Sequence, residues 1–144
     1  MKTANILLVE DNEGDILLTT EALEDSKILN KIDIVRTGKD ALDYVFKKGI
    51  YHNVIEPDLI LLDINLPYKS GHEVLHIIKE HEAVKHIPII MLTTSSSERD
   101  ISLSYKHHAN CYITKPVDVI NFLDAIATIE HFWLSIVTLP SKKK

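Results

Sequence analysis

Leu59-Ile60-Leu61-Leu62-Asp63 is a run of four apolar residues that ends at a carboxylate. Continuous apolar character over this length is typical of a strand that is covered on both faces of a parallel sheet. Three similar runs, at residues 6–9, 89–92 and 111–114, also end at polar side chains or a proline. The four runs therefore predict parallel strands whose carboxyl ends carry Glu10, Asp11, Asp63, Thr93, Lys115 and Pro116.

Apolar runs alternate with helical patterns five times along the chain, which is the pattern of an α/β fold. Strands are predicted near residues 4–10, 31–36, 58–63, 87–93 and 111–115, and helices near residues 13–26, 38–48, 71–82, 98–109 and 118–137. The second strand alternates polar and apolar residues, which suits an edge strand. Gly38 is expected to open a helix and Gly49 to close one. The pattern predicts a doubly wound, five-stranded parallel sheet with helices on both faces.

Composition and charge limit the classes of function. The chain has 144 residues, 45% hydrophobic and 26% charged, which suits a globular protein with a single domain over residues 1–144. A net charge of −5 argues against a nonspecific nucleic-acid surface. The single cysteine, Cys111, excludes an intrachain disulfide and fits a reducing compartment. No segment has the ~20 apolar residues of a membrane span, and the first apolar run is too short for a signal peptide. We expect a cytoplasmic protein with no membrane or nucleic-acid partner.

The polar residues at the strand ends predict a phosphorylation site. In a doubly wound sheet, ligands bind beyond the carboxyl ends of the strands, so Glu10, Asp11 and Asp63 are expected to converge. Three close carboxylates repel one another unless they protonate or hold a cation, and hard oxygen ligands of this kind suit Mg²⁺. A lysine and a hydroxyl group, from Lys115 and Thr93, suit phosphoryl oxygens beside the metal. The pattern predicts that Asp63 is phosphorylated.

The same residues lie in segments that resemble the receiver domain of two-component response regulators. The resemblance covers residues 4–130 and implies the flavodoxin-like strand order 2-1-3-4-5. A shorter match, at residues 110–115 and 132–140, resembles the single-domain regulators associated with bacterial phytochromes. The segments that match the receiver family, in its order and spacing, are Val9-Glu10-Asp11-Asn12, Leu61-Leu62-Asp63-Ile64-Asn65-Leu66-Pro67, Gly71, Met91-Leu92-Thr93-Thr94 and Tyr112-Ile113-Thr114-Lys115-Pro116.

This resemblance implies a role for each site residue. Asp63 is the phosphoacceptor, with Lys115 and Thr93 as the other catalytic residues, and the donor is a sensor histidine kinase, which the shorter match makes a phytochrome-type light sensor. The chain is then a signalling switch and not an enzyme. The Lys115–Pro116 peptide bond is expected to be cis. The implied ligands of Mg²⁺ are Asp11, Asp63, the main-chain carbonyl of Asn65, and Glu10 through a metal-bound water.

Thr93 and Tyr112 form the switch that the resemblance implies. The hydroxyl group of Thr93 would bond a phosphoryl oxygen only after phosphorylation, and Tyr112 would fill the space that Thr93 leaves. The alternative is that Tyr112 is an amphipathic strand residue with a hydrated hydroxyl group. Thr94 stands where the family usually has a very small residue, which puts the rate of phosphate turnover in doubt.

A hydrolase that forms an aspartyl-phosphate intermediate is the main alternative function. Such phosphatases usually place the nucleophile after the first strand, whereas Asp63 follows the third predicted strand. A non-phosphorylated interaction module is disfavoured because none of the acidic, hydroxyl or lysine positions is missing. His72 and His76 are four residues apart, a spacing that can bind zinc, but no third ligand is in register and a solvated helix face is the simpler interpretation.

The last predicted helix, residues 118–137, is longer than a receiver needs to cover its sheet, at about five to six turns. Its apolar surface broadens from Ile129 onward, and contiguous exposed apolar surface usually marks an interface. We expect a homodimer, with a short loose tail at residues 138–144; the alternative is that the segment folds back over its own domain. The predicted interface residues are Ile129, Phe132, Trp133 and Ile136.

Overall fold

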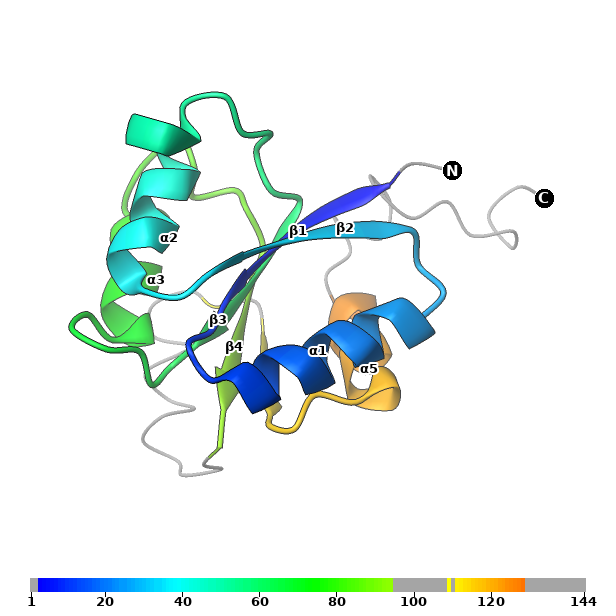
Figure 1. The fold of residues 1–144 in the computed structure, drawn as a ribbon. Helices are drawn as coiled ribbons and strands as arrows, with labels where there is room; N and C mark the ends of the chain where they lie inside the picture. The colour runs from blue at the N-terminus through cyan, green and yellow to red at the C-terminus, as the bar shows by residue number, and fades with distance from the viewer. Residues whose placement is uncertain (1–2, 95–108, 110, 129–144) are drawn as a thin grey trace.

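The computed structural model describes residues 3–94, 109 and 111–128. Its centre is a five-stranded parallel sheet in the order β2-β1-β3-β4-β5 (Figure 1), so the predicted fold class and strand order are confirmed. The strand predicted to lie at an edge, β2, does lie at an edge. The five strands are β1 (Ala4–Val9), β2 (Asn30–Val35), β3 (Leu59–Asp63), β4 (Ile89–Thr93) and β5 (Cys111–Thr114).

Helices cover both faces of the sheet. The helices α1 (Glu13–Asp25) and α5 (Val119–Ala127) lie side by side on one face, and α2 (Gly38–Val45) and α3 (Gly71–Lys79) cover the other (Figure 1). Each face has its own apolar core, because alternate residues of the central strands point to opposite sides. None of the described helices is long and apolar enough to cross a bilayer.

Two predicted features fall mainly outside the described residues. The helix predicted at 98–109 is described only at Ala109, so the structure does not test it. The helix α5 is described over Val119–Ala127 and the chain as far as Thr128. The predicted extension to residue 137, the tail at 138–144 and the four predicted interface residues, Ile129, Phe132, Trp133 and Ile136, lie outside the described residues.

Side chains at the helix starts account for where the helices begin. Asn12 and Thr37 accept hydrogen bonds from the first turns of α1 and α2. At α3, Ser70 and Glu73 form a reciprocal capping box, in which each side chain accepts from the other residue's main-chain N–H. These caps follow directly after strand ends or short loops, and they hold the helices close to the carboxyl edge of the sheet.

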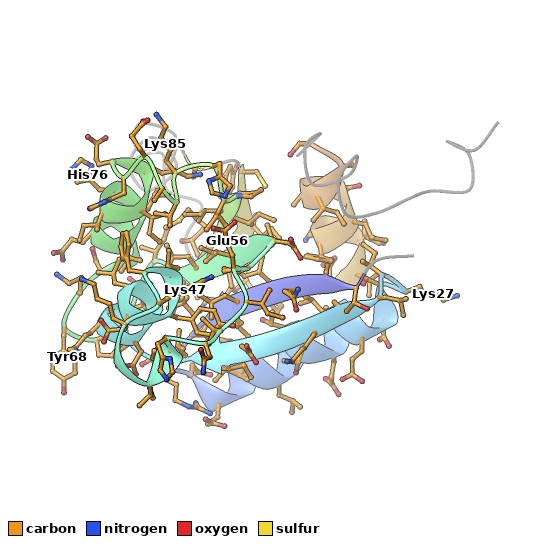
Figure 2. The ribbon with its side chains drawn as sticks, turned by 90° about the horizontal axis from the view of Figure 1, so that it is seen from above. Lys27, Lys47, Glu56, Tyr68, His76 and Lys85 are labelled. Atoms are coloured by element: carbon orange, nitrogen blue, oxygen red, sulfur yellow. The ribbon has the colours of Figure 1, made fainter. Side chains whose placement is uncertain are left out.

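The predicted end of α2 was wrong. The helix ends at Val45 and not near residue 48, and Gly49 begins the short 3-10 helix η1 (Gly49–Tyr51) instead of closing α2. Lys47 takes the left-handed conformation, with φ of 56°, and lies far from Lys27, which does the same after α1 (Figure 2). The main-chain N–H groups of residues 47 and 48 donate back to residues 44 and 43, which is the Schellman arrangement with lysine in the usual place of glycine.

Candidate functional site

The register of the parallel strands brings the predicted site residues to one edge of the sheet. Val9 at the end of β1 pairs with Leu62 of β3, and Thr93 at the end of β4 pairs with Thr114 of β5. The main chain continues this alignment beyond the strands, because the N–H of Lys115 donates to the carbonyl of Thr93 at 2.6 Å. The residues that follow the strands therefore lie next to one another, although they come from distant parts of the chain.

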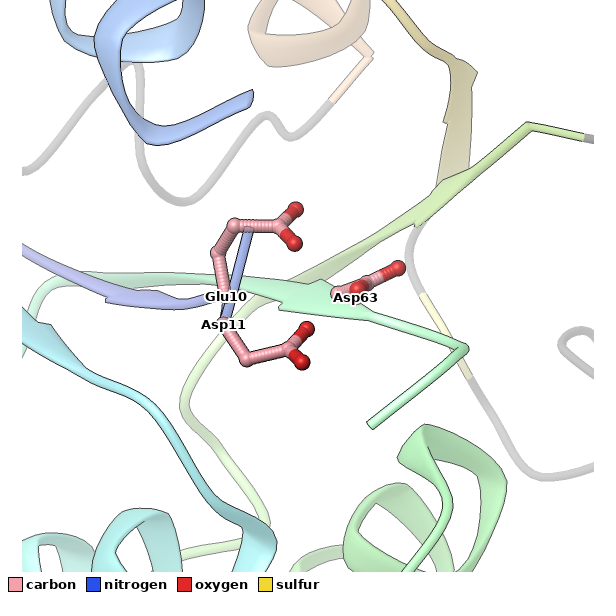
Figure 3. Close-up of side chains that lie close together, drawn as sticks. All are labelled: Glu10, Asp11 and Asp63. Atoms are coloured by element: carbon pink, nitrogen blue, oxygen red, sulfur yellow. The ribbon is translucent and has the colours of Figure 1, made fainter. Parts of the chain in front are cut away.

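Glu10, Asp11 and Asp63 form the acidic triad of the site. One carboxylate oxygen from each lies within 4.8 Å of the others, and Figure 3 shows the three side chains close together at the ends of β1 and β3. Glu10 and Asp63 are buried, with 0% and 1% of their surface exposed, whereas Asp11 is exposed. A cation at this point would reach two buried carboxylates and remain open to solvent beside the third. Hard carboxylate oxygens with an open side suit a divalent cation that keeps water ligands.

The ammonium group of Lys115 lies against the triad. Its Nζ atom is 2.9 Å from Oε1 of Glu10, 2.9 Å from Oδ2 of Asp15 and 3.2 Å from Oδ1 of Asp63. Only 6% of the lysine side chain is exposed, so these contacts are shielded from bulk water. The Lys115–Pro116 peptide bond is cis, as the family resemblance implies. An ammonium group has three hydrogens, and all three have a carboxylate within reach.

The positive charge of one lysine does not offset the repulsion among the three carboxylates of the triad. Burial raises the pKa of Glu10 from 4.5 to about 7, and Asp63 adds to this effect against the opposing hydrogen bond from Lys115. Burial by itself lowers the pKa of Lys115, but its hydrogen bonds to Asp15 and Glu10 and the charge of Asp63 raise it, so the ammonium stays charged. A bound cation would relieve the repulsion that remains among the acids.

Main-chain groups orient the two buried carboxylates. The N–H of Asn65 donates to Oδ1 of Asp63 at 3.2 Å, and the N–H of Asn12 donates to Oε2 of Glu10 at 3.3 Å. The predicted metal ligand Asn65 thus lies beside the predicted phosphoacceptor, Asp63. The site opens into a cavity of about 410 Å³, lined by Glu10, Asp11, Asn12, Glu13, Asp15, Asp63, Asn65, Thr94 and Lys115.

The two predicted switch residues lie on neighbouring strands. Thr93 ends β4 and is 1% exposed. Tyr112 is half-buried on β5, opposite Met91, and packs against the core on the α2 and α3 face. Since Met91 and Thr93 are two residues apart on one strand, Thr93 and Tyr112 share a face of the sheet. This placement is compatible with a coupled movement, and the exchange itself stays a prediction.

The predicted alternative of a zinc site at His72 and His76 gains no support. Within the ranges that the structure describes, the acidic triad is the one group of three or more histidine, cysteine, aspartate or glutamate side chains that could hold a metal ion. The two histidines belong to α3, and no third metal-binding side chain of the described ranges groups with them. His76 is exposed, as the interpretation of a solvated helix face predicts, whereas the ring nitrogens of His72 are buried.

Asp15 is a site residue that the sequence pattern did not predict. It lies in the first turn of α1, three residues after the cap Asn12, whose side chain accepts from the N–H of Asp15 at 2.9 Å. Helical side chains tilt toward the amino end of their helix, which directs Asp15 toward the strand ends. A carboxylate four residues after Asp11 at the start of a predicted helix was the available signal.

Comparison with known proteins gives a family match over most of the chain. Residues 6–127 match the family model described as the response regulator receiver domain. The curated protein "Response regulator Rcp1" of Synechocystis sp. is 45% identical over 136 residues, which are 94% of this chain and 92% of that protein. The family match includes all the described helices and strands except the first two residues of β1.

Solved structures agree with this match. The chain is similar to the "Phosphorylated Cyanobacterial Phytochrome Response Regulator RcpA", with 47% identity, a TM-score of 0.78, and coverage of 96% of this chain and 99% of that one. It is also similar to the "Mn(2+)-bound form of response regulator Rcp1", with 44% identity, a TM-score of 0.76, and coverage of 95% and 99%. The titles of these relatives report phosphorylation and a bound divalent metal ion.

Proposed function

Since this chain belongs to the response regulator receiver domain family, we propose that Asp63 accepts a phosphoryl group from a sensor histidine kinase. The observation that carries the proposal is the buried carboxylate of Asp63, which lies 3.2 Å from the ammonium of Lys115 and within the acidic triad. A buried aspartate beside a lysine and two further acids is poorly suited to a purely structural role, because one ammonium group cannot neutralise three close carboxylates.

The chemistry at Asp63 is a simple displacement. A carboxylate oxygen of Asp63 attacks the phosphorus, the P–N bond to the kinase's histidine breaks, and the imidazole leaves. Lys115 then gives up its 3.2 Å contact with Asp63 and pairs with a phosphoryl oxygen. The N–H of Asn65 holds the attacking carboxylate in place. The hydroxyl group of Thr93, at the end of the adjacent strand, bonds a second phosphoryl oxygen.

We assign Mg²⁺ as the cation of the site. Support comes from the hard donor set of the triad and from a relative whose title names bound Mn²⁺. When bound, the cation neutralises charge that opposes the approach of a phosphoryl donor. Asp11 and Asp63 would be direct ligands with the carbonyl of Asn65, and Glu10 would act through water. Asp11→Asn should therefore weaken Mg²⁺ binding more than Glu10→Gln, measured by calorimetric titration.

The proposed partner is a phytochrome-type histidine kinase. Support comes from the relative whose title names a phytochrome response regulator, which matches this chain over 96% of its length. A purified phytochrome kinase that has phosphorylated itself should transfer its phosphate to this chain faster than a kinase of another sensory class. Equal transfer from both kinases would remove the basis for this assignment.

Intact mass spectrometry tests the phosphoacceptor. The chain is incubated with Mg²⁺ and acetyl phosphate, and one phosphoryl adduct is expected. Asp63→Asn should abolish this adduct, whereas Asp25→Asn should keep it, because Asp25 is an exposed aspartate at the end of α1. A full adduct on the Asp63→Asn protein would refute the assignment of the acceptor.

Thr93 and Tyr112 are proposed to transmit the phosphorylated state. Thr93→Ala should leave Asp63 able to accept phosphate but should suppress the chemical-shift changes of β5 and α5 that follow addition of beryllofluoride, a phosphoryl mimic. The spectra of the variant and of the wild type are compared with and without the mimic. Wild-type shift changes in Thr93→Ala would mean that the coupling does not pass through this hydroxyl group.

A further inference from the structure

We propose that Asp15 is a positioning residue, which holds Lys115 in place for phosphoryl transfer at Asp63; the inference rests on the function proposed above. Two of the three carboxylates around the ammonium, Glu10 and Asp63, belong to the acidic triad. The third, Asp15, lies outside the triad and contacts Lys115 at 2.9 Å. The lysine is therefore anchored partly by a residue that does not belong to the triad.

The position of Asp15 outside the triad matters because the charge of the triad changes during the reaction. A cation at the triad would bind Asp63 directly and Glu10 through a water molecule, and it would also repel the ammonium of Lys115. Once Asp63 carries the phosphoryl group, its carboxylate has lost its negative charge. Asp15 keeps its charge through both events, so its bond to Lys115 is the one carboxylate contact that is expected to persist.

The anchor itself is held by local structure. The N–H of Asp15 is fixed by the side chain of Asn12 at 2.9 Å, which orients the first turn of α1. The Asp15 side chain is 27% exposed and that of Lys115 is 6% exposed, so this pair is screened less than an ion pair on the open surface. An anchored ammonium can exchange its Asp63 contact for a phosphoryl oxygen without leaving the site.

Glu13 provides a matched control within the same helix turn. It is also an acid in the first turn of α1 and it lines the same cavity, but its side chain is 77% exposed and pairs with Arg36. Glu13→Gln removes the same charge from the same helix end as Asp15→Asn does. Effects on the helix dipole and on the general field of the site are therefore similar in the two variants, whereas only Asp15 touches Lys115.

The experiment is a double-mutant cycle on the full 144-residue chain. Its members are Asp15→Asn, Lys115→Met, the double variant, and the control Glu13→Gln, and all are checked for folding by circular dichroism. Phosphorylation by acetyl phosphate at saturating Mg²⁺ is followed by intact mass. In this step the oxygen of Asp63 bonds to phosphorus, the bond from phosphorus to the acetyl oxygen breaks, and acetate leaves.

Loss of the contact between Asp15 and Lys115 should lower the rate of phosphorylation even when the metal site is saturated with Mg²⁺. We expect Asp15→Asn to slow phosphorylation about tenfold at saturating Mg²⁺, since misplacing a catalytic group by a fraction of an ångström has effects of this order. Glu13→Gln should stay within about twofold of wild type. In the Lys115→Met background, Asp15→Asn should change the rate by less than about twofold, because there is no lysine left to position. Asp15→Glu should recover part of the rate.

Two results would overturn the inference about Asp15. One is an equal effect of Asp15→Asn and Glu13→Gln, and the other is an undiminished effect of Asp15→Asn in the Lys115→Met background, which would mean that Asp15 acts through its charge alone. Binding of Mg²⁺ without any phosphodonor, measured by calorimetry on the same variants, gives an independent reading. Without Asp15, the ammonium of Lys115 is expected to bind only the carboxylates of the triad and to compete there with the cation. The affinity for Mg²⁺ should therefore drop more in Asp15→Asn than in Glu13→Gln. This drop should disappear in the Lys115→Met background.

The two measurements separate the inference from the function on which it rests. A wild-type chain that takes no phosphate at Asp63 refutes the proposed function, and the Mg²⁺ cycle then still decides whether Asp15 acts on Lys115. A phosphorylated wild type with no coupling between Asp15 and Lys115 in either measurement refutes the inference alone.

Discussion

Gly71 is the position where the smallest possible change is expected to have the largest effect on the site. It is the first residue of α3, and a β-carbon added there would stand 2.2 Å from the carbonyl oxygen of Asp63 and 2.8 Å from the α-carbon of Ile64. The N–H of Gly71 also donates to the carbonyl of Ile64 at 2.9 Å. The start of α3 and the end of β3 are therefore in direct contact at Asp63, the proposed phosphoacceptor.

The size of the effect follows from what the added methyl group would meet. Ordinary contacts begin at 3.4 Å, so α3 and the end of β3 must separate by about 1.2 Å, the difference between 3.4 and 2.2 Å, to accommodate Gly71→Ala. Both groups in contact are main chain, so no side chain can rotate away. Overpacking in a rigid interior typically destabilises by about 1–3 kcal/mol, and we expect at least 3 kcal/mol because the backbone itself must move.

Urea denaturation followed by circular dichroism measures this loss. The matched control is Gly14→Ala in the first turn of α1, where the added carbon meets only the side-chain oxygen of Asn12 at 3.3 Å. That variant should stay within about 1 kcal/mol of wild type, since alanine is the better helix former and a side chain can yield. Phosphorylation of Asp63 should also slow in Gly71→Ala under conditions where the protein is folded. A Gly71→Ala protein as stable as Gly14→Ala would refute the reasoning.

Three further predictions concern other parts of the chain. Ser70→Ala removes one half of the capping box at α3 and should lower the free energy of unfolding by about 1 kcal/mol in urea titrations; no change would deny the cap a role in stability. Burial lowers the pKa of Lys79 from 10.5 to about 8, so the unfolded chain binds more protons between these values and stability should rise with pH across that window. Lys79→Met removes this titration, and the wild type should gain roughly 1–2 kcal/mol relative to the variant between pH 7.5 and pH 9.5, whereas parallel profiles would contradict the shift. Trp133, outside the described residues, is predicted from the sequence to anchor a homodimer; Trp133→Glu should then sediment as a monomer that still accepts phosphate, and a wild type that is already monomeric at high micromolar concentration would exclude the dimer.

The sheet could be predicted from the sequence because burial leaves a direct mark on it. β3 and β4 are covered on both faces, so each is a continuous apolar run, and every one of their residues is buried. β2 lies at an edge of the sheet, and its sequence alternates between polar and apolar residues. The polar residues that end these runs stand out for the same reason, and parallel strands bring their carboxyl ends to one edge. The convergence of Glu10, Asp11, Asp63 and Lys115 could therefore be predicted from the sequence alone.

The ends of helices were harder to predict from the sequence. Gly49 has the residue type that usually closes a helix, but the left-handed turn after α2 is made by Lys47. A lysine can adopt that conformation at a modest energetic penalty when the returning main-chain hydrogen bonds and the packing of the next segment require it. Local preference identified the neighbourhood of the turn, whereas the exact residue depended on where α2 stops packing against the sheet.

The chain alone determined which residue types stand at the strand ends, and tertiary structure decided which acids reach the lysine. Glu13 and Asp15 are two positions apart on α1, about 200° around the helix axis, so only one of them can contact Lys115. The rotation of α1 settles the choice, because Ile16, Ala22 and Leu23 must be buried against the sheet and α5. That rotation turns Asp15 toward Lys115, which lies 100 residues away in the sequence, and turns Glu13 toward solvent and Arg36. No local sequence pattern encodes the contact between Asp15 and Lys115, because the packing of α1 on the sheet creates it.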